Sequence, residues 1–110
     1  MILKNADIFD FDFNLRRADL RVEDGLIAEI GENLSGAEEH DLSGSVILPG
    51  FIDIHIHGCG GADFSDALPD TLETMSKTLA RFGVTSFCPA SMTLPYERIE
   101  RAFERAAEYI

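Results

Sequence analysis

Basic residues are scarce in this 110-residue sequence. It holds 9 Lys and Arg against 20 Asp and Glu, which gives a formal net charge of −11 at pH 7. A nucleic-acid-binding protein needs the opposite sign, because Lys and Arg must neutralise the phosphates. We therefore expect no nucleic-acid partner.

Long apolar runs and cysteines are scarce as well. The sequence has no run of about 18 apolar residues, so no membrane partner is expected, and residues 1–10 lack the basic and then apolar pattern of a signal peptide. Two cysteines, Cys59 and Cys88, are too few for a disulfide scaffold. We expect a cytoplasmic protein with reduced thiols. A hydrophobic content of 45% is typical of a globular domain.

The first part of the chain shows the pattern of short strands. Asp24-Gly25 stands between two apolar runs and predicts a hairpin, since a tight hairpin turn needs positive φ. The apolar pattern predicts strands at residues 1–9, 18–23, 26–30, 41–42 and 46–48.

After Pro49-Gly50 the pattern changes to strand, helix, strand, helix. Strands are expected at residues 51–57 and 84–88, with Cys88 buried. The first helix should bury a stripe at helical spacing and have Pro69 in its first turn; the stripe consists of Leu72, Met75, Leu79 and Phe82. Thr93 is expected to cap the second helix, with Pro95 in its first turn. This order predicts an α/β fold with a parallel sheet. Because two parallel strands are not stable alone, we expect the chain to be the beginning of a longer protein.

Two histidines at the end of the predicted strand 51–57 are the main candidates for chemistry. His55 and His57 are two residues apart, so both imidazoles should point to one face, together with Asp53. Two such imidazoles can bind Zn²⁺ or Fe²⁺. Ile54 and Ile56 should lie on the opposite face, under the stripe of the first helix. The alternative is that the two histidines only form local hydrogen bonds.

A glycine-rich loop follows the histidines directly. Gly58, Gly60 and Gly61 allow positive φ and a close approach of backbone N–H groups to a polar or anionic substrate. We regard them as candidate substrate-binding residues. The alternative is a tight turn that needs glycine only for its conformation.

At these residues the sequence resembles the amidohydrolase superfamily, in which a strand carrying His-x-His opens the barrel. Within it, PGFIDIHIHGCGGADFSDA followed by GVTSFCPASMT resembles the N-acetylglucosamine-6-phosphate deacetylase family. The resemblance implies a fold in two parts. Residues 1–48 would belong to a small β-sandwich domain, and residues 49–110 would form the first two βα units of a (β/α)8 barrel.

The resemblance also implies a function. The complete enzyme would hydrolyse the acetamide of a small-molecule amino-sugar phosphate, N-acetylglucosamine 6-phosphate, with one or two divalent ions, Zn or Fe. It would be a homo-oligomer, a dimer, in the cytoplasm. The acid/base Asp is expected beyond Ile110, so no catalytic residue is assigned here and the fragment alone should be inactive. Alternatives are another amidohydrolase (an N-acyl-amino-acid hydrolase or a cyclic amidase) and a non-catalytic interaction module.

Overall fold

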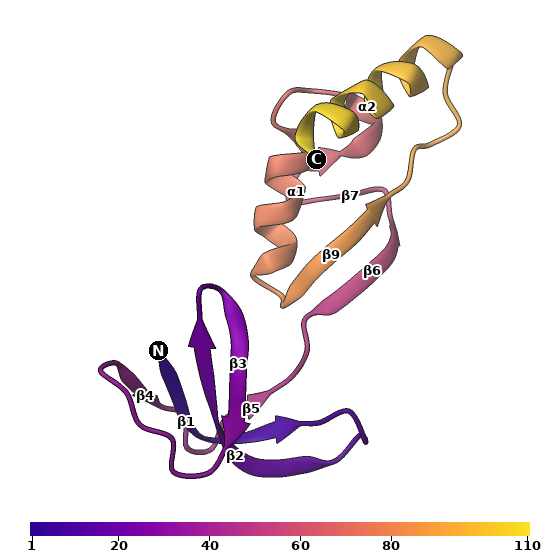
Figure 1. The fold of residues 1–110 in the computed structure, drawn as a ribbon. Coiled ribbons are helices and arrows are strands. Elements are labelled where there is room, and N and C mark those ends of the chain that lie inside the picture. The colour runs from indigo at the N-terminus through magenta and orange to yellow at the C-terminus, as the bar shows by residue number, and fades with distance from the viewer. The chain divides into compact units, whose positions relative to one another are not determined.

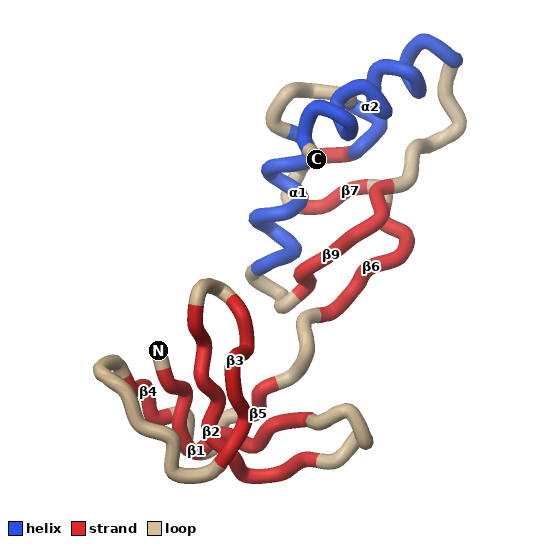
Figure 2. The backbone as a smooth tube through the Cα atoms, in the orientation of Figure 1, coloured by secondary structure: helices blue, strands red, loops and turns tan.

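The computed structural model describes residues 1–110 and divides them into two compact units, Met1–Pro49 and Gly50–Ile110 (Figure 1). Figure 2 shows strands and loops only in the first unit, and strands with helices in the second. The chain is therefore a mixed α/β protein, as the sequence predicts. Neither helix of the second unit has the length and the apolar composition that a membrane-spanning helix requires.

The first unit is a five-stranded sheet around strand β1. Its strands are β1 (Ile2–Phe9), β2 (Leu15–Glu23), β3 (Leu26–Gly31), β4 (Glu39–Asp41) and β5 (Val46–Ile47). The strand order is β3-β2-β1-β4, and β5 also pairs with β1. The β1–β2 and β2–β3 pairs are antiparallel, whereas β4 and β5 run parallel to β1. A small core of alternating side chains forms on one face: Ala6, Ile8, Ala18 and Leu20.

The predicted hairpin at Asp24-Gly25 is confirmed. These two residues connect β2 and β3, and their φ angles are +50° and +76°. Positive φ at both central positions matches the right-handed twist of the flanking strands, which explains the Asp-Gly pair at this point.

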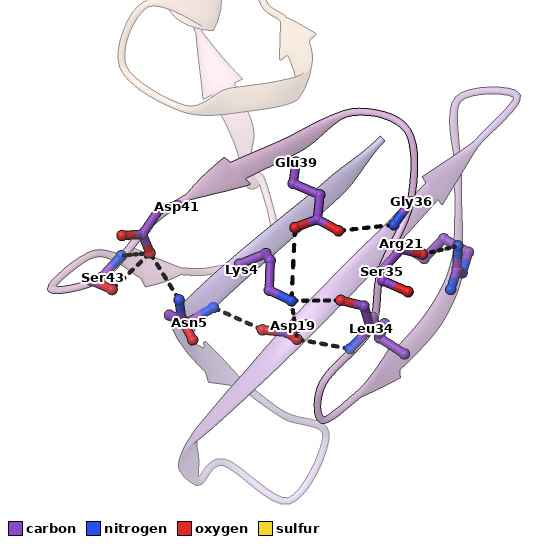
Figure 3. A network of polar contacts seen from close by, with 10 residues as sticks. All are labelled: Lys4, Asn5, Asp19, Arg21, Leu34, Ser35, Gly36, Glu39, Asp41 and Ser43. Atoms are coloured by element: carbon purple, nitrogen blue, oxygen red, sulfur yellow. Dashed lines mark hydrogen bonds and ion pairs between the residues drawn. The ribbon is translucent and has the colours of Figure 1, made fainter.

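A buried carboxylate ties β1, β2 and the loop after β3 together (Figure 3). Asp19 is 4% exposed. One of its oxygens accepts the Asn5 N–H at 2.8 Å, and the other accepts the Leu34 N–H at 3.0 Å. The Lys4 ammonium lies 3.6 Å from Asp19 and also donates to the Leu34 carbonyl. Because every buried group here has a partner, the network stabilises the sheet instead of leaving a free charge.

The second unit pairs two parallel strands with two helices. Strands β6 (Phe51–Ile56) and β9 (Val84–Pro89) are parallel, and β7 (Gly58–Cys59) and β8 (Ala62–Asp63) form a small antiparallel hairpin. The remaining elements are the 3-10 helix η1 (Phe64–Asp66) and the helices α1 (Thr71–Ala80) and α2 (Tyr96–Tyr109). The core consists of Phe64, Ala67, Leu72, Met75 and Ala102. The predicted order of strand, helix, strand and helix is confirmed.

The predicted helix ends were wrong in detail. Helix α1 begins at Thr71, so Pro69 precedes it, and Phe82 lies beyond its last turn and is 74% exposed. Helix α2 begins after Pro95, which is its N-cap, so Thr93 caps nothing. The reason is steric: the Pro95 ring disfavours helical geometry at the residue before it, so Leu94 is not the first residue of the helix.

The predicted burial of two strand residues was also wrong. Ile54 is 80% exposed, and the described contacts of α1 are with β7, β8, β9 and η1. Ile56, in contrast, packs on the core. Cys88 in β9 is exposed. Because α1 leaves the middle of β6 uncovered, Ile54 is exposed, and the alternation along the strand did not predict this.

Candidate metal-binding site at the end of strand β6

The candidate site lies where β6 ends. His55 is the penultimate residue of β6, and His57 follows the strand directly. The residue directly after the neighbouring strand β9 fixes this end, because the Ala90 N–H donates to the Ile56 carbonyl at 2.8 Å. Active sites of α/β proteins gather at this carboxyl end of parallel strands.

The two imidazoles converge on each other. Their Nε2 atoms are 3.4 Å apart, and their ring centroids are 5.1 Å apart with nearly perpendicular planes. This agrees with the common face expected from the spacing of His55 and His57. Asp53 was expected to point to the same face as the two imidazoles. Its carboxylate instead accepts the His55 backbone N–H at 3.0 Å.

A backbone contact determines the tautomer of His57. Its Nδ1 lies 2.8 Å from the Ala90 carbonyl oxygen. A carbonyl oxygen can only accept, so Nδ1 carries the proton and, in the neutral ring, Nε2 has a free lone pair. A hydrogen bond from the second ring nitrogen to a carbonyl is the usual way in which a metal-binding histidine is oriented.

The separation of the two Nε2 atoms fits a shared metal ion. Two nitrogens, each about 2.0–2.1 Å from one tetrahedral ion, lie roughly 3.3–3.4 Å apart. The same separation also allows His55 Nε2–H to donate to His57 Nε2, so local hydrogen bonding remains the alternative. No group of three or more His, Cys, Asp or Glu residues is placed to bind a metal. The chain can thus supply two donors of the three or four, approximately, that a zinc site takes from protein.

The glycines after His57 have packing reasons of their own. Gly60 and Gly61, with φ of +63° and +85°, form the turn of the β7–β8 hairpin. A Cβ atom on Gly58 would clash with the backbone of Ala62 and Asp63, and one on Gly60 would clash with the Thr78 side chain. The expected glycine-rich loop is therefore a tight hairpin, and a substrate contact of these glycines stays a prediction.

Cys59 lies close to the histidines in sequence but belongs to the core. Its Sγ is 3.6 Å from the Met75 carbonyl oxygen, and the residue packs against the core of the second unit. Burial, and secondly the negative charge of Asp53, raises the pKa of the thiol. A protonated thiol is a poor metal ligand, so Cys59 fills space in the core and is not grouped with the two histidines.

Two residues near the site were not singled out by the sequence. Ala90 bonds to His57, and Ser65 accepts the Met92 N–H from a distant segment of the chain. Ala90 acts through its carbonyl oxygen, and any residue type supplies that group, so no side-chain signal was available. Ser65 lies in η1, where the Asp63 carboxylate accepts its N–H at 2.8 Å as part of a capping box with Asp66. A lone serine in a loop predicts neither a cap nor a contact with a distant segment.

Comparisons with known proteins agree on one family. The family model described as amidohydrolase matches residues 46–110. The N-acetylglucosamine-6-phosphate deacetylase of Lysinibacillus sphaericus is 32% identical over 104 residues, which cover 93% of this chain and 27% of that protein. The N-acetylgalactosamine-6-phosphate deacetylase of Escherichia coli O157:H7 is 37% identical over 89 residues, 81% of this chain and 23% of that protein.

A solved structure is similar along nearly the whole chain. The crystal structure of N-acetylglucosamine-6-phosphate deacetylase from Pasteurella multocida matches with a TM-score of 0.90 and 31% identity, covering 98% of this chain and 30% of that one. The chain spans about a quarter of the length of the two curated relatives above. The matched family model includes β6 and both histidines. The chain belongs to the amidohydrolase family.

Proposed function

We propose that this chain is part of a metal-dependent deacetylase that hydrolyses the acetamide of N-acetylglucosamine 6-phosphate to glucosamine 6-phosphate and acetate. The observation that carries the proposal is the convergence of His55 Nε2 and His57 Nε2 at 3.4 Å, with His57 Nδ1 bonded to a carbonyl. The similarity to deacetylases of amino-sugar phosphates supports the substrate class.

The two units would have different roles in the complete enzyme. The sheet within residues 1–48 would contribute to a small β-sandwich domain, and residues 49–110 would begin a (β/α)8 barrel. The parallel β6–β9 pair and its intervening helix α1 support the barrel assignment, since a barrel repeats this unit. The complete enzyme is proposed to be a homo-oligomer, a dimer, in the cytoplasm.

In the complete enzyme, the residues of this chain would hold a metal ion and orient one of its histidine ligands. His55 and His57 would bind a divalent ion, Zn or Fe, through Nε2, and the Ala90 carbonyl would keep the His57 proton on Nδ1. When bound, such an ion supplies Lewis acidity, which polarises the amide carbonyl and activates the attacking water. The backbone at Gly58, Gly60 and Gly61 would line the substrate, and the acid/base Asp would come from beyond Ile110.

A second candidate substrate is N-acetylgalactosamine 6-phosphate. The E. coli relative with 37% identity is named for that substrate. The two sugars differ only in the configuration at one ring carbon. Both substrates require the same chemistry at the acetamide.

The test is a comparison of substrates in the complete enzyme loaded with Zn²⁺ or Fe²⁺. We expect acetate release from N-acetylglucosamine 6-phosphate to exceed that from N-acetylgalactosamine 6-phosphate and from N-acetyl amino acids. A strong loss of turnover is expected for the double variant His55→Ala/His57→Ala. Preference for an N-acyl amino acid or a cyclic amide would overturn the proposed substrate. Full turnover by the double variant would overturn the metal role of the pair.

The 110-residue chain by itself should release no acetate. Two imidazoles leave a metal ion with too few protein ligands, and the residues described include no third one in reach. Measurable turnover by the isolated chain, above that of its His57→Ala variant, would contradict this expectation.

A further inference from the structure

Ser65 holds a segment that lies far from it in sequence. It is the middle residue of η1 and is 6% exposed. Its Oγ accepts the backbone N–H of Met92 at 2.9 Å. The serine is itself fixed, because its N–H donates to Asp63 Oδ1 at 2.8 Å and its carbonyl accepts from Arg98 Nη2 at 3.3 Å. The backbone of Ser65 is thus held on both sides, and its buried hydroxyl is directed at Met92.

The segment held by Ser65 carries the acceptor for His57. Ala90 lies two residues before Met92, and its carbonyl oxygen accepts His57 Nδ1–H at 2.8 Å. The residue before Ser65 returns to the same histidine, since the Phe64 N–H donates to the His57 carbonyl at 2.8 Å. Hydrogen bonds and short backbone stretches thus form a closed ring from His57 through η1 to Met92, Ala90 and back to His57.

We propose that Ser65 is a positioning residue for His57. It holds the Ala90 carbonyl where His57 can donate to it, and it thereby keeps Nε2 unprotonated and directed at His55. The inference rests on the proposed function, in which this Nε2 binds the metal. Ser65 forms no hydrogen bond with His57, so its effect is transmitted through the peptide groups of residues 90–92.

The physical argument is the cost of an unpartnered amide. Without the Ser65 hydroxyl, the Met92 N–H has no acceptor and must turn toward water or stay unpaired. Turning it moves the neighbouring peptide groups, among them the Ala90 carbonyl. A neutral imidazole that loses its acceptor at Nδ1 also populates the tautomer with the proton on Nε2, and in that tautomer Nε2 has no lone pair with which to bind a metal.

The three histidines of the chain make a direct measurement possible. In the full chain with ¹⁵N-labelled histidine, long-range ¹H–¹⁵N spectra report the tautomer of each ring without metal, and His40 serves as the internal reference. We expect wild-type His57 to carry its proton on Nδ1, and Ser65→Ala to show a mixture of tautomers. When Zn²⁺ alone is titrated, the His57 ring signals of Ser65→Ala should show a Zn²⁺ affinity about tenfold lower than that of wild type.

Matched variants separate this role from general destabilisation. Ser76→Ala removes a hydroxyl of the same unit, one bonded to the Tyr109 hydroxyl at 2.7 Å, and should change neither readout. Ser65→Thr retains the hydroxyl and should restore the wild-type tautomer. If Ser65→Ala loses its folded amide spectrum, Ser65→Cys, which has a similar shape but is a weak acceptor, replaces it in the metal-free measurement.

The outcomes distinguish the two proposals. The positioning role would be overturned if folded Ser65→Ala kept the wild-type tautomer of His57 and the wild-type Zn²⁺ affinity. Where Ser65→Cys replaces that variant, a wild-type tautomer in Ser65→Cys would overturn it. If wild type and His57→Ala bind Zn²⁺ equally, the proposed metal site is wrong. The tautomer comparison then still decides whether Ser65 positions His57.

Discussion

Gly60 packs directly on Thr78, and no side chain fits between them. A Cβ atom on Gly60 would clash with Thr78 Oγ1, which is itself held by a hydrogen bond of 2.8 Å to the Thr74 carbonyl. The contact fixes the turn of the β7–β8 hairpin against helix α1, and the hairpin directly follows the histidine pair.

Gly60→Ala should therefore lower the free energy of unfolding by roughly 2–4 kcal/mol, because the clash adds to the cost of positive φ. The measurement is urea denaturation. Gly61→Ala is the matched control: it also has positive φ, but a Cβ atom there would meet nothing within 4 Å. We expect it to cost about 1 kcal/mol. Equal losses in the two variants would show that packing on Thr78 is unimportant.

The histidine pair should matter for metal binding and little for folding. His55 is exposed and His57 is half-buried. His55→Ala and His57→Ala should each lower Zn²⁺ affinity at least tenfold, as the loss of a direct ligand requires. Their melting temperatures should change by only a few degrees. Calorimetric titration with Zn²⁺ and thermal melting test this.

His40→Ala serves as the control for that experiment. His40 is exposed in β4, where its Nε2 lies 2.9 Å from Glu38 Oε1, and it should leave Zn²⁺ binding unchanged. A large loss of stability with unchanged metal binding in the His55 or His57 variants would favour the alternative, in which the pair only forms local hydrogen bonds.

The buried carboxylate of the first unit should make its stability depend on pH. The pKa of Asp19 lies below its ordinary value of 3.8, chiefly because the Asn5 N–H donates to it, with further contributions from the Leu34 N–H and Lys4 that outweigh burial. A carboxylate whose pKa is lower in the folded state than in the unfolded state stabilises the fold at pH values above its unfolded pKa. That contribution is lost as the pH falls below 3.8 and through the folded pKa.

Asp19→Asn tests this contribution. Asparagine offers one acceptor oxygen, so its NH₂ group must face one of the two N–H donors. We expect a loss of roughly 1–3 kcal/mol at pH 7, which shrinks below about pH 4 as wild-type Asp19 is protonated. Asp7→Asn, which removes an exposed carboxylate paired with Arg17, is the control and should have a small effect. A pH-independent difference between wild type and Asp19→Asn would contradict the assignment.

Burial separates two apolar residues that the sequence pattern treats alike. Met75 is fully buried in the core of the second unit, so Met75→Ala should cost about 2–5 kcal/mol. Ile54→Ala should change the stability of this chain by no more than about 0.5 kcal/mol, because Ile54 is 80% exposed. Denaturant unfolding of both variants tests the difference. A loss at Ile54 as large as that at Met75 would mean that this part of β6 is covered in solution.

The sequence predicted what depends on neighbouring residues in the chain. The Asp24-Gly25 turn, the strand before His57 and the stripe of Leu72, Met75 and Leu79 all follow from local periodicity and turn chemistry. It could not predict the exposure of Ile54 or Cys88, because burial of a strand residue depends on which element covers the sheet. The role of the Ala90 carbonyl was equally hidden, since a backbone group leaves no trace in residue type.

The parallel pairing of β4 and β5 with β1 has a consequence for synthesis on the ribosome. Strand β1 leaves the exit tunnel before β2 and can pair with it once their short connection has emerged. Its other edge stays open until residues 39–47 have followed, because both of its parallel partners lie there. The nascent chain therefore presents an unpaired strand edge during this interval, and unpaired edges are where chains associate wrongly. The β1–β2–β3 meander should form early, and closure by β4 and β5 should be the slower event.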